Sequence, residues 1–301
     1  MIINEFKSHF FKRLALGSAQ FGLKYGIANE YGQVSPDEVR KILSVAADHK
    51  IHTLDTAIAY GGSERTLGQI GVTDWNIVTK LPAVPDRCTN IEQWIDHQIS
   101  ESLTRLGVTR LHAVLLHRPG QLLESQGKEL LAALETLKHK GLTNKIGISV
   151  YSPDELERLF EKMNFDLVQA PLNILDRRFI DTGWTSRLRN MGVELHTRST
   201  FLQGLLLMPA SRRPVKFRRW DSLWFEWERW LNESGVTPLE ACLRYVLSIE
   251  EIDKVIVGID GLHQLHEILA ATSGSLTSLP SWQQPIDSEL ISPAQWMHLQ
   301  S

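Results

Sequence analysis

The chain has 301 residues, 43% of them hydrophobic and 22% charged, which is the composition of a folded protein rather than a disordered chain. Its 32 basic and 35 acidic residues give a formal net charge of -3, so nucleic acid is not expected as a partner, and no run of about eighteen apolar residues is present to cross a membrane. Its two cysteines lack a CxxC partner and its N-terminus lacks an apolar run of secretory length, which excludes a disulfide framework and predicts a cytoplasmic protein.

Short apolar runs recur along the chain and alternate with longer stretches in which apolar residues are three or four positions apart. The runs are Leu14–Leu16, His52–Leu54, Asn76–Thr79, His112–Leu116, Lys145–Ser149, Leu167–Gln169, Val193–His196 and Lys254–Val257. This alternation predicts parallel strands joined by crossover helices.

Three of the expected helices begin with the same sequence pattern. The segments that start at Ser35, Ser152 and Thr237 all read S/T-P-x-E. In such a capping box the hydroxyl accepts from the free backbone N–H groups, proline presets the backbone, and the glutamate bonds back to the cap residue. We therefore expect a reciprocal cap at each of these three positions.

Eight strands and about eight helices fit either a closed barrel or an open doubly wound sheet. No GxGxxG motif follows the first strand, which removes the main support for the open sheet. The sequence thus predicts an α/β fold, a (β/α)8 TIM barrel in a single domain over residues 1–271, with a tail over residues 272–301 that packs on the barrel. Residues 207–233 form an insertion after the seventh strand.

The insertion combines arginines with tryptophans, a composition that RNA-binding segments also show. Trp224, Trp227 and Trp230 are spaced at i, i+3 and i+6, which places them on one face of a helix. We therefore interpret them as a packing face. In the tail, Trp282 and Trp296 are expected to act as anchors.

Polar residues stand where several predicted strands end. Active sites of (β/α)8 barrels are built at the carboxyl ends of the strands. Asp55, Lys80 and His117 follow the second, third and fourth strands, and Tyr60 lies in the turn after Asp55. Taken singly, the aspartate could be a helix cap, the lysine a solvated side chain and the histidine a loop residue. Four different reactive groups on one rim favour a catalytic site.

The four groups suit one type of chemistry. A phenol has a pKa near about 10, and a nearby lysine is expected to lower it. An aspartate would keep that lysine charged, and a histidine could donate a hydrogen bond to a carbonyl oxygen. The set therefore predicts protonation of an oxygen that gains negative charge, as when a carbonyl accepts a hydride.

These residues also carry a family resemblance. The segment from Asp55 through Tyr60 to Gly68 resembles the D-x-A-x-x-Y-G-x-S-E-x-x-L-G block of the aldo-keto reductases, and Lys80 and His117 match its other two catalytic positions. The opening residues 16–29 resemble a bacterial branch of that family. The resemblance covers residues 14–271.

The resemblance implies NADPH or NADH bound in extended form across the rim, with no metal. It assigns cofactor contacts to Gly17, Ser18, Asp55, Ser149, Gln169, Arg198, Ser199, Phe201, Leu202, Gln203, Gly204, Gly258 and Gln264. Two positions depart from the family pattern. Val150 stands where asparagine is usual, and Arg198 stands where an aromatic ring stacks on the nicotinamide.

The last loop departs as well. The family mostly prefers NADPH, but Asp260 lies about where a basic residue would meet the 2′-phosphate, which indicates tolerance of NADH. Glu267 matches a further position near the adenosine. The alternative is that Asp260 only caps the helix that follows it.

The implied substrate is a small carbonyl compound, or an alcohol or sugar in the reverse direction, held by Tyr25, Tyr60 and His117. Trp75 is expected to line the same pocket. Two other hypotheses stay open: a nucleotide-binding sensor or regulatory protein with little turnover, and an aldolase that uses Lys80 as a Schiff-base amine. The oligomeric state is left open.

Overall fold

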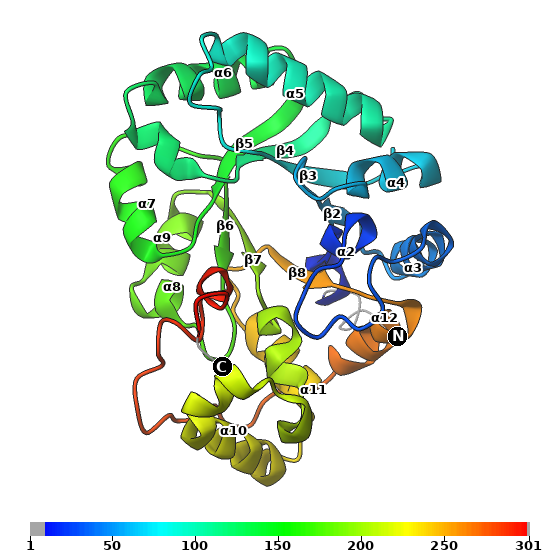
Figure 1. Cartoon of the computed structure of the whole chain (residues 1–301), viewed down its shortest axis with the longest axis vertical. Coiled ribbons are helices and arrows are strands. Elements are labelled where there is room, and N and C mark those ends of the chain that lie inside the picture. Colours follow the sequence, from blue (N-terminus) through cyan, green and yellow to red (C-terminus); the bar gives the residue numbers. More distant parts are fainter. Residues whose placement is uncertain (1–9, 300–301) are drawn as a thin grey trace.

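In the computed structural model, eight parallel strands close into a barrel in the order β1 to β8, with β8 pairing back to β1 (Figure 1). The closed parallel barrel confirms the predicted fold class. The strands are β1 (Leu14–Gly17), β2 (Thr53–Asp55), β3 (Asn76–Leu81), β4 (Leu111–Leu116), β5 (Thr143–Ser149), β6 (Leu167–Pro171), β7 (Glu194–Arg198) and β8 (Lys254–Gly258). The structure describes residues 10–299. Residues 1–9, part of the N-terminus that lacks an apolar run of secretory length, and residues 300–301 lie outside that range.

All eight predicted strands are present, but several extend further at the carboxyl end than the apolar runs indicate. The added residues include Gly17, Asp55, Lys80 and Arg198. Glycine and charged residues do not continue an apolar run, yet their backbone groups still pair with the next strand. Strand pairing therefore includes Asp55 and Lys80, two of the residues expected to carry the chemistry.

The helices alternate with the strands and surround the barrel. They are α2 (Ala19–Gly22), α3 (Pro36–Asp48), α4 (Ser63–Ile70), α5 (Ile91–Leu106), α6 (Gly127–His139), α7 (Pro153–Phe160), α8 (Arg178–Asp181), α9 (Trp184–Asn190), α10 (Asp221–Ser234), α11 (Pro238–Leu247) and α12 (Leu262–Ala271). Short 3-10 helices are η1 (Pro119–Leu123), η2 (Leu202–Leu207), η3 (Ala210–Arg212), η4 (Val215–Trp220) and η5 (Pro293–Gln295). Among the described residues, no helix is long and apolar enough to cross a membrane.

The three S/T-P-x-E segments do begin helices, but only one forms the full reciprocal cap. Thr237 and Glu240 bond each other's backbone at the start of α11. Ser35 accepts from the backbone N–H of Glu38, whereas the Glu38 carboxylate points elsewhere and accepts from Leu262 at the start of α12. The expectation was wrong for Ser152 too, because its side chain makes no cap bond at α7. A tertiary partner therefore redirects Glu38, whereas Glu155 accepts from the Tyr151 N–H, one residue before the cap position.

The core has two parts, and the smaller one lies beneath the predicted site. Most buried apolar side chains form one cluster, whereas Val78, Ala113, Leu115 and Leu167 form a separate one. Side chains two positions apart in a strand share a face. Lys80, His117 and Gln169 follow members of this smaller cluster at that spacing, so they continue the same face toward the carboxyl ends of β3, β4 and β6.

After β7 come η2 and then the insertion, which contains η3, η4 and α10. Trp224, Trp227 and Trp230 are all buried on α10, as the i, i+3, i+6 spacing predicts. The final segment runs past α10 and returns to the barrel, where η5 lies (Figure 1). Trp282 packs against Trp227 with ring centroids 6.4 Å apart, and buried Trp296 packs edge-on against Phe217 at 4.9 Å.

Candidate active site

A buried ion pair holds two of the predicted groups at the carboxyl ends of β2 and β3. The Lys80 ammonium donates to the two carboxylate oxygens of Asp55 at 2.8 and 2.7 Å and to the backbone carbonyl of Thr56 at 2.9 Å. The Lys80 and Asp55 side chains are only 1% and 6% exposed. Since the three N–H groups of the ammonium have three acceptors, the geometry is that of a charged lysine.

The other two predicted groups adjoin this pair. Tyr60 lies in the loop after β2, and the Lys80 nitrogen is 5.1 Å from the centroid of its ring. The His117 ring, just after β4, meets the Tyr60 ring edge-on, with centroids 6.1 Å apart. The structure thus brings Asp55, Tyr60, Lys80 and His117 together at one rim.

The electrostatics of Tyr60 differ from the sequence-based expectation. Burial raises the pKa of the Tyr60 phenol, the Asp55 carboxylate raises it further, and the Arg198 guanidinium opposes both. The expected lowering of the Tyr60 pKa by Lys80 was wrong, because Asp55 neutralises the lysine through two direct contacts. Tyr60 is therefore a protonated phenol at neutral pH and can act as a proton donor.

His117 is a neutral imidazole at neutral pH. Burial lowers the pKa of His117 to about 4, and the positive charge of Lys80 contributes to the decrease. Burial also lowers the pKa of Lys80, and the ion pair with Asp55 opposes that change. A neutral imidazole has one ring N–H that can donate to an oxygen without giving up its proton.

An elongated cavity runs along this rim from Tyr60 to the start of α12. Fifteen of the sequence-assigned positions line this cavity: Gly17, Ser18, Tyr25, Asp55, Tyr60, Gln169, Arg198, Ser199, Phe201, Gln203, Gly204, Gly258, Asp260, Gln264 and Glu267. Ser149 and Leu202 are among the assigned cofactor residues that do not line it. Ser149 is buried behind Gln169, to which its hydroxyl donates at 3.3 Å, and the Leu202 side chain is fully buried.

The loop after β7 is strained where it borders this cavity. Ser199, Leu202 and Gln203 have φ values of 66°, 48° and 53°, a region that residues with a side chain rarely adopt. Gly204 follows with φ 87°. Such conformations cost free energy and cluster at ligand-binding segments, because the surrounding fold must hold them in place.

Arg198 borders the cavity beside Tyr60. Its guanidinium donates to the Val150 carbonyl at 2.9 Å and lies over the Tyr151 ring, 4.5 Å from the centroid. Stacking of a planar guanidinium on an aromatic face fixes its orientation. The cavity wall here thus carries a positive charge.

Negative charge gathers at the other end of the cavity. Asp260 is half-buried and accepts from the Asn29 side-chain amide at 3.0 Å. It does not cap α12, whose cap residue is Gly261, so the capping alternative was wrong. The first N–H of α12, at Leu262, instead donates to the Glu38 carboxylate at 2.8 Å.

A second cavity lies on the other side of the Tyr60–His117 contact. Its lining residues are Ala59, Pro82, Ala83, His117, Arg118, Tyr151 and Ala294. Ala294 belongs to the tail, so the C-terminal segment forms part of this wall. Trp75 was wrongly expected here: it directly precedes β3, at the opposite end of the barrel, and packs edge-on against His52.

Sequence reasoning missed Tyr151 and Ala294 as residues of the site, and for Gln169, which the resemblance assigns to the cofactor, it missed the bond to Asp55. Gln169 donates to Asp55 at 2.6 Å, but the two residues are 114 positions apart in the chain. Tyr151 and Ala294 line the second cavity without any motif around them. Only Gln169 had a detectable signal, because it ends a predicted strand.

Comparisons with known proteins identify the family and agree with the fold. The family model described as Aldo/keto reductase family matches residues 13–279. Oxidoreductase sirO of Leptosphaeria maculans is 24% identical over 290 residues, covering 85% of this chain and 87% of that protein, and NADH-specific methylglyoxal reductase of Escherichia coli is 24% identical over 200 residues, covering 61% and 60%. Among solved structures, the holo form of aldo-keto reductase AKR11C1 from Bacillus halodurans superposes with a TM-score of 0.70 at 22% identity, covering 88% of each chain.

Proposed function

Since this chain belongs to the aldo/keto reductase family and is an NAD(P)H-dependent oxidoreductase, we propose that it reduces an aldehyde or ketone to the alcohol, with Tyr60 as the proton donor. The observation that carries this proposal is the position of Tyr60, whose phenol borders the elongated cavity while its ring contacts His117, which lines the second one. The elongated cavity suits an extended dinucleotide, and the second suits a small carbonyl compound.

Each residue then has a distinct part in the reaction. NAD(P)H, when bound, supplies a hydride to the carbonyl carbon. As that bond forms, the π electrons move to the carbonyl oxygen, and Tyr60 gives this oxygen its proton, which leaves a phenolate. His117, neutral and without need to lose its proton, donates a hydrogen bond to the same oxygen.

Lys80, Asp55 and Arg198 act on the charge that Tyr60 acquires. The Asp55 carboxylate keeps Lys80 charged and oriented behind the phenol. The Arg198 guanidinium lowers the pKa of Tyr60 against the effects of burial and Asp55. Oxidation of an alcohol or sugar would use the same groups in reverse, with the phenolate accepting the proton.

In this proposal, the end of the cavity next to α12 favours NADH over NADPH. The 2′-phosphate of NADPH needs cations or free backbone N–H groups. Among the residues that line the cavity, the acidic ones are Asp55, Asp260 and Glu267, and the cationic one is Arg198 beside Tyr60. The N–H of Leu262 at the α12 terminus already donates to Glu38, so a phosphate would meet carboxylates there.

Two other functions receive less support. A Schiff-base aldolase needs a neutral, accessible lysine, whereas the three contacts of Lys80 satisfy an ammonium and Lys80 is missing from the described residues that line either cavity. A regulatory protein with little turnover would not need four reactive groups in contact. The relative named NADH-specific methylglyoxal reductase supports small carbonyl compounds as the first to test.

The test is a panel of aldehydes and ketones assayed with NADH and NADPH in parallel, with the alcohol product quantified. We expect at least one carbonyl compound to oxidise the reduced cofactor with equal amounts of alcohol formed. Cofactor binding without oxidation by any member of a broad panel, in either direction, would favour the regulatory alternative.

A further inference from the structure

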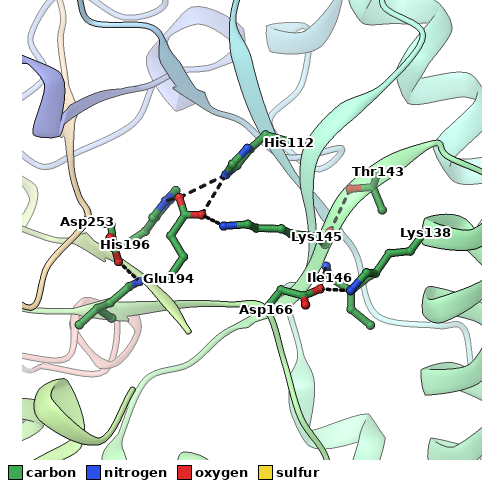
Figure 2. Close-up of polar contacts among 10 residues, drawn as sticks. His112, Lys138, Thr143, Lys145, Ile146, Asp166, Glu194, His196 and Asp253 are labelled. Atoms are coloured by element: carbon green, nitrogen blue, oxygen red, sulfur yellow. Dashed lines mark hydrogen bonds and ion pairs between the residues drawn. The ribbon is translucent and has the colours of Figure 1, made fainter. Parts of the chain in front are cut away.

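A second group of chemistry-bearing side chains lies at the opposite end of the barrel from Tyr60. Glu194 is the first residue of β7, His196 follows two positions later, His112 is near the start of β4, and Lys145 is near the start of β5. Figure 2 shows His112, Lys145 and His196 all directed at the Glu194 carboxylate. None of these four side chains takes part in the proposed reduction.

The nitrogen and oxygen atoms of this cluster are already close together. Nε2 of His196 is 2.6 Å from Oε1 of Glu194, and Nε2 of His112 is 3.1 Å from Oε2. One donor atom from each of these three residues lies within 4.8 Å of the others. The two imidazole rings are parallel, with an interplanar angle of 3° and centroids 6.5 Å apart.

Burial of the cluster is graded from the interior outward. The His196 side chain is fully buried, Glu194 is 13% exposed, and His112 is 20% exposed. The hydrogen bonds do not satisfy every polar atom, since Nδ1 of His196 has no partner among the described residues. The three candidate ligand groups are thus already assembled, and the cluster is open to solvent at its outer side.

We propose that His112, Glu194 and His196 bind one divalent transition-metal ion of the zinc type at the amino end of the barrel. Imidazole nitrogens and carboxylate oxygens are the ligands that zinc takes at about 2.0–2.2 Å. Tetrahedral geometry then separates the ligand atoms by about 3.3 Å. Nε2 of His112 is already 3.1 Å from the Glu194 carboxylate, whereas Nε2 of His196, now at 2.6 Å, would move outward. The ion would replace the protons that the two imidazoles now share with Glu194, and water would supply the fourth ligand.

Lys145 competes with such an ion. Its ammonium contacts Oε2 of Glu194, so one carboxylate oxygen is now paired with a positive charge. The Lys145 side chain is 34% exposed and can turn toward solvent when the ion binds. Lys145 therefore weakens the site without blocking it, and removing its charge should strengthen binding.

The proposed ion would connect strands that do not pair. β5 and β6 separate β4 from β7 around the barrel, so the contact between His112 and Glu194 crosses the barrel end. A ligand that binds only the folded state stabilises that state. We therefore assign the ion a role in holding the barrel end together rather than in catalysis.

The test uses the full chain after treatment with a chelator. Zn²⁺ is titrated by calorimetry and Co²⁺ by its visible ligand-field absorption, and the melting temperature is measured with and without Zn²⁺. Wild type should bind one equivalent with a rise in melting temperature, and His112→Gln should bind at least about tenfold more weakly, a difference of about 1.4 kcal/mol. His97→Gln, which removes an exposed histidine on α5, should match wild type.

Lys145→Met provides the complementary measurement. It keeps all three ligands and should bind at least about tenfold more tightly than wild type. Failure of both wild type and Lys145→Met to bind one equivalent would overturn the proposal. Binding by Lys145→Met alone would overturn it for the natural chain, as would equal weakening by His112→Gln and His97→Gln.

Discussion

The Gln169 amide nitrogen donates to Oδ1 of Asp55 at 2.6 Å, and the same oxygen also accepts from the Lys80 ammonium. The carboxylate is thereby held from two sides by groups on β6 and β3. Among the described residues, the Asp55 carboxylate accepts from Lys80 and Gln169 and shares no hydrogen bond with the Tyr60 phenol. This contact explains why a side chain remote in sequence belongs to the proposed catalytic arrangement.

Lys80→Met should remove activity and also destabilise the fold. The substitution leaves the Asp55 charge buried with one donor, Gln169, and breaking a buried ion pair from one side costs about 3–5 kcal/mol. Unfolding in denaturant measures that loss, and cofactor oxidation measures activity.

The double variant Lys80→Met/Asp55→Asn separates the two effects. It removes both charges, so most of the lost stability should return while activity stays low. Recovery of wild-type activity in the double variant would show that the ion pair only supports the fold.

His117 should make stability depend on pH in a defined range. The pKa of His117 is about 4 in the folded chain and about 6.5 when unfolded. Between these values the unfolded chain binds a proton that the folded chain does not, so this contribution to stability is present above about pH 6.5 and is lost as the pH falls toward 4. Lys80, Asp55, Arg198 and Arg118 are the charged groups that act on it.

The check is the free energy of unfolding of wild type and His117→Gln between pH 4 and 7. The variant should show a shallower decrease on acidification, and His97→Gln should follow wild type. Identical slopes for wild type and His117→Gln would place His117 in a solvated environment and count against its role as a neutral donor.

Asp260→Arg should shift cofactor preference. Replacing a carboxylate by a guanidinium at the α12 end of the cavity should tighten NADPH at least about tenfold, which is about 1.4 kcal/mol, and leave NADH within a few-fold. Fluorescence titration of both cofactors measures this. Glu250→Arg makes the same charge change at the other end of the barrel and should alter neither affinity.

A similar change in NADH and NADPH affinity for Asp260→Arg would show that Asp260 does not face the 2′-phosphate. Glu38→Gln then offers a second approach, since it weakens the carboxylate contact at Leu262. Tighter NADPH binding in Glu38→Gln alone would place the discrimination at the helix terminus.

The fold could be predicted because each strand and helix is indicated by a pattern among neighbouring residues. The run His112–Leu116 contains the apolar residues that a sheet buried on both faces requires, and all eight predicted runs overlap strands of the barrel. Asp55, Lys80 and His117 were found by their place after those strands. Because a barrel brings the carboxyl ends of its strands together, these residues could be expected to lie close together although no contact between them was known.

What the sequence did not predict depends on contacts between distant segments. Nothing near Glu38 indicates that its carboxylate bonds Leu262, 224 residues later, rather than its own helix cap. His112 and Glu194 are 82 positions apart and belong to no motif. The pKa of Tyr60 depends on burial and on how fully Asp55 neutralises Lys80, neither of which the sequence states.

Tyr60→Phe tests the central claim most directly, because it removes one oxygen and keeps the ring against His117. With a carbonyl compound that wild type reduces, the rate of cofactor oxidation should fall by about 10²–10⁴-fold, while the dissociation constant of the cofactor stays within about threefold. Tyr31→Phe, which changes an exposed phenol, should retain wild-type turnover. Turnover in Tyr60→Phe within a few-fold of wild type would contradict the assignment of Tyr60 as the proton donor.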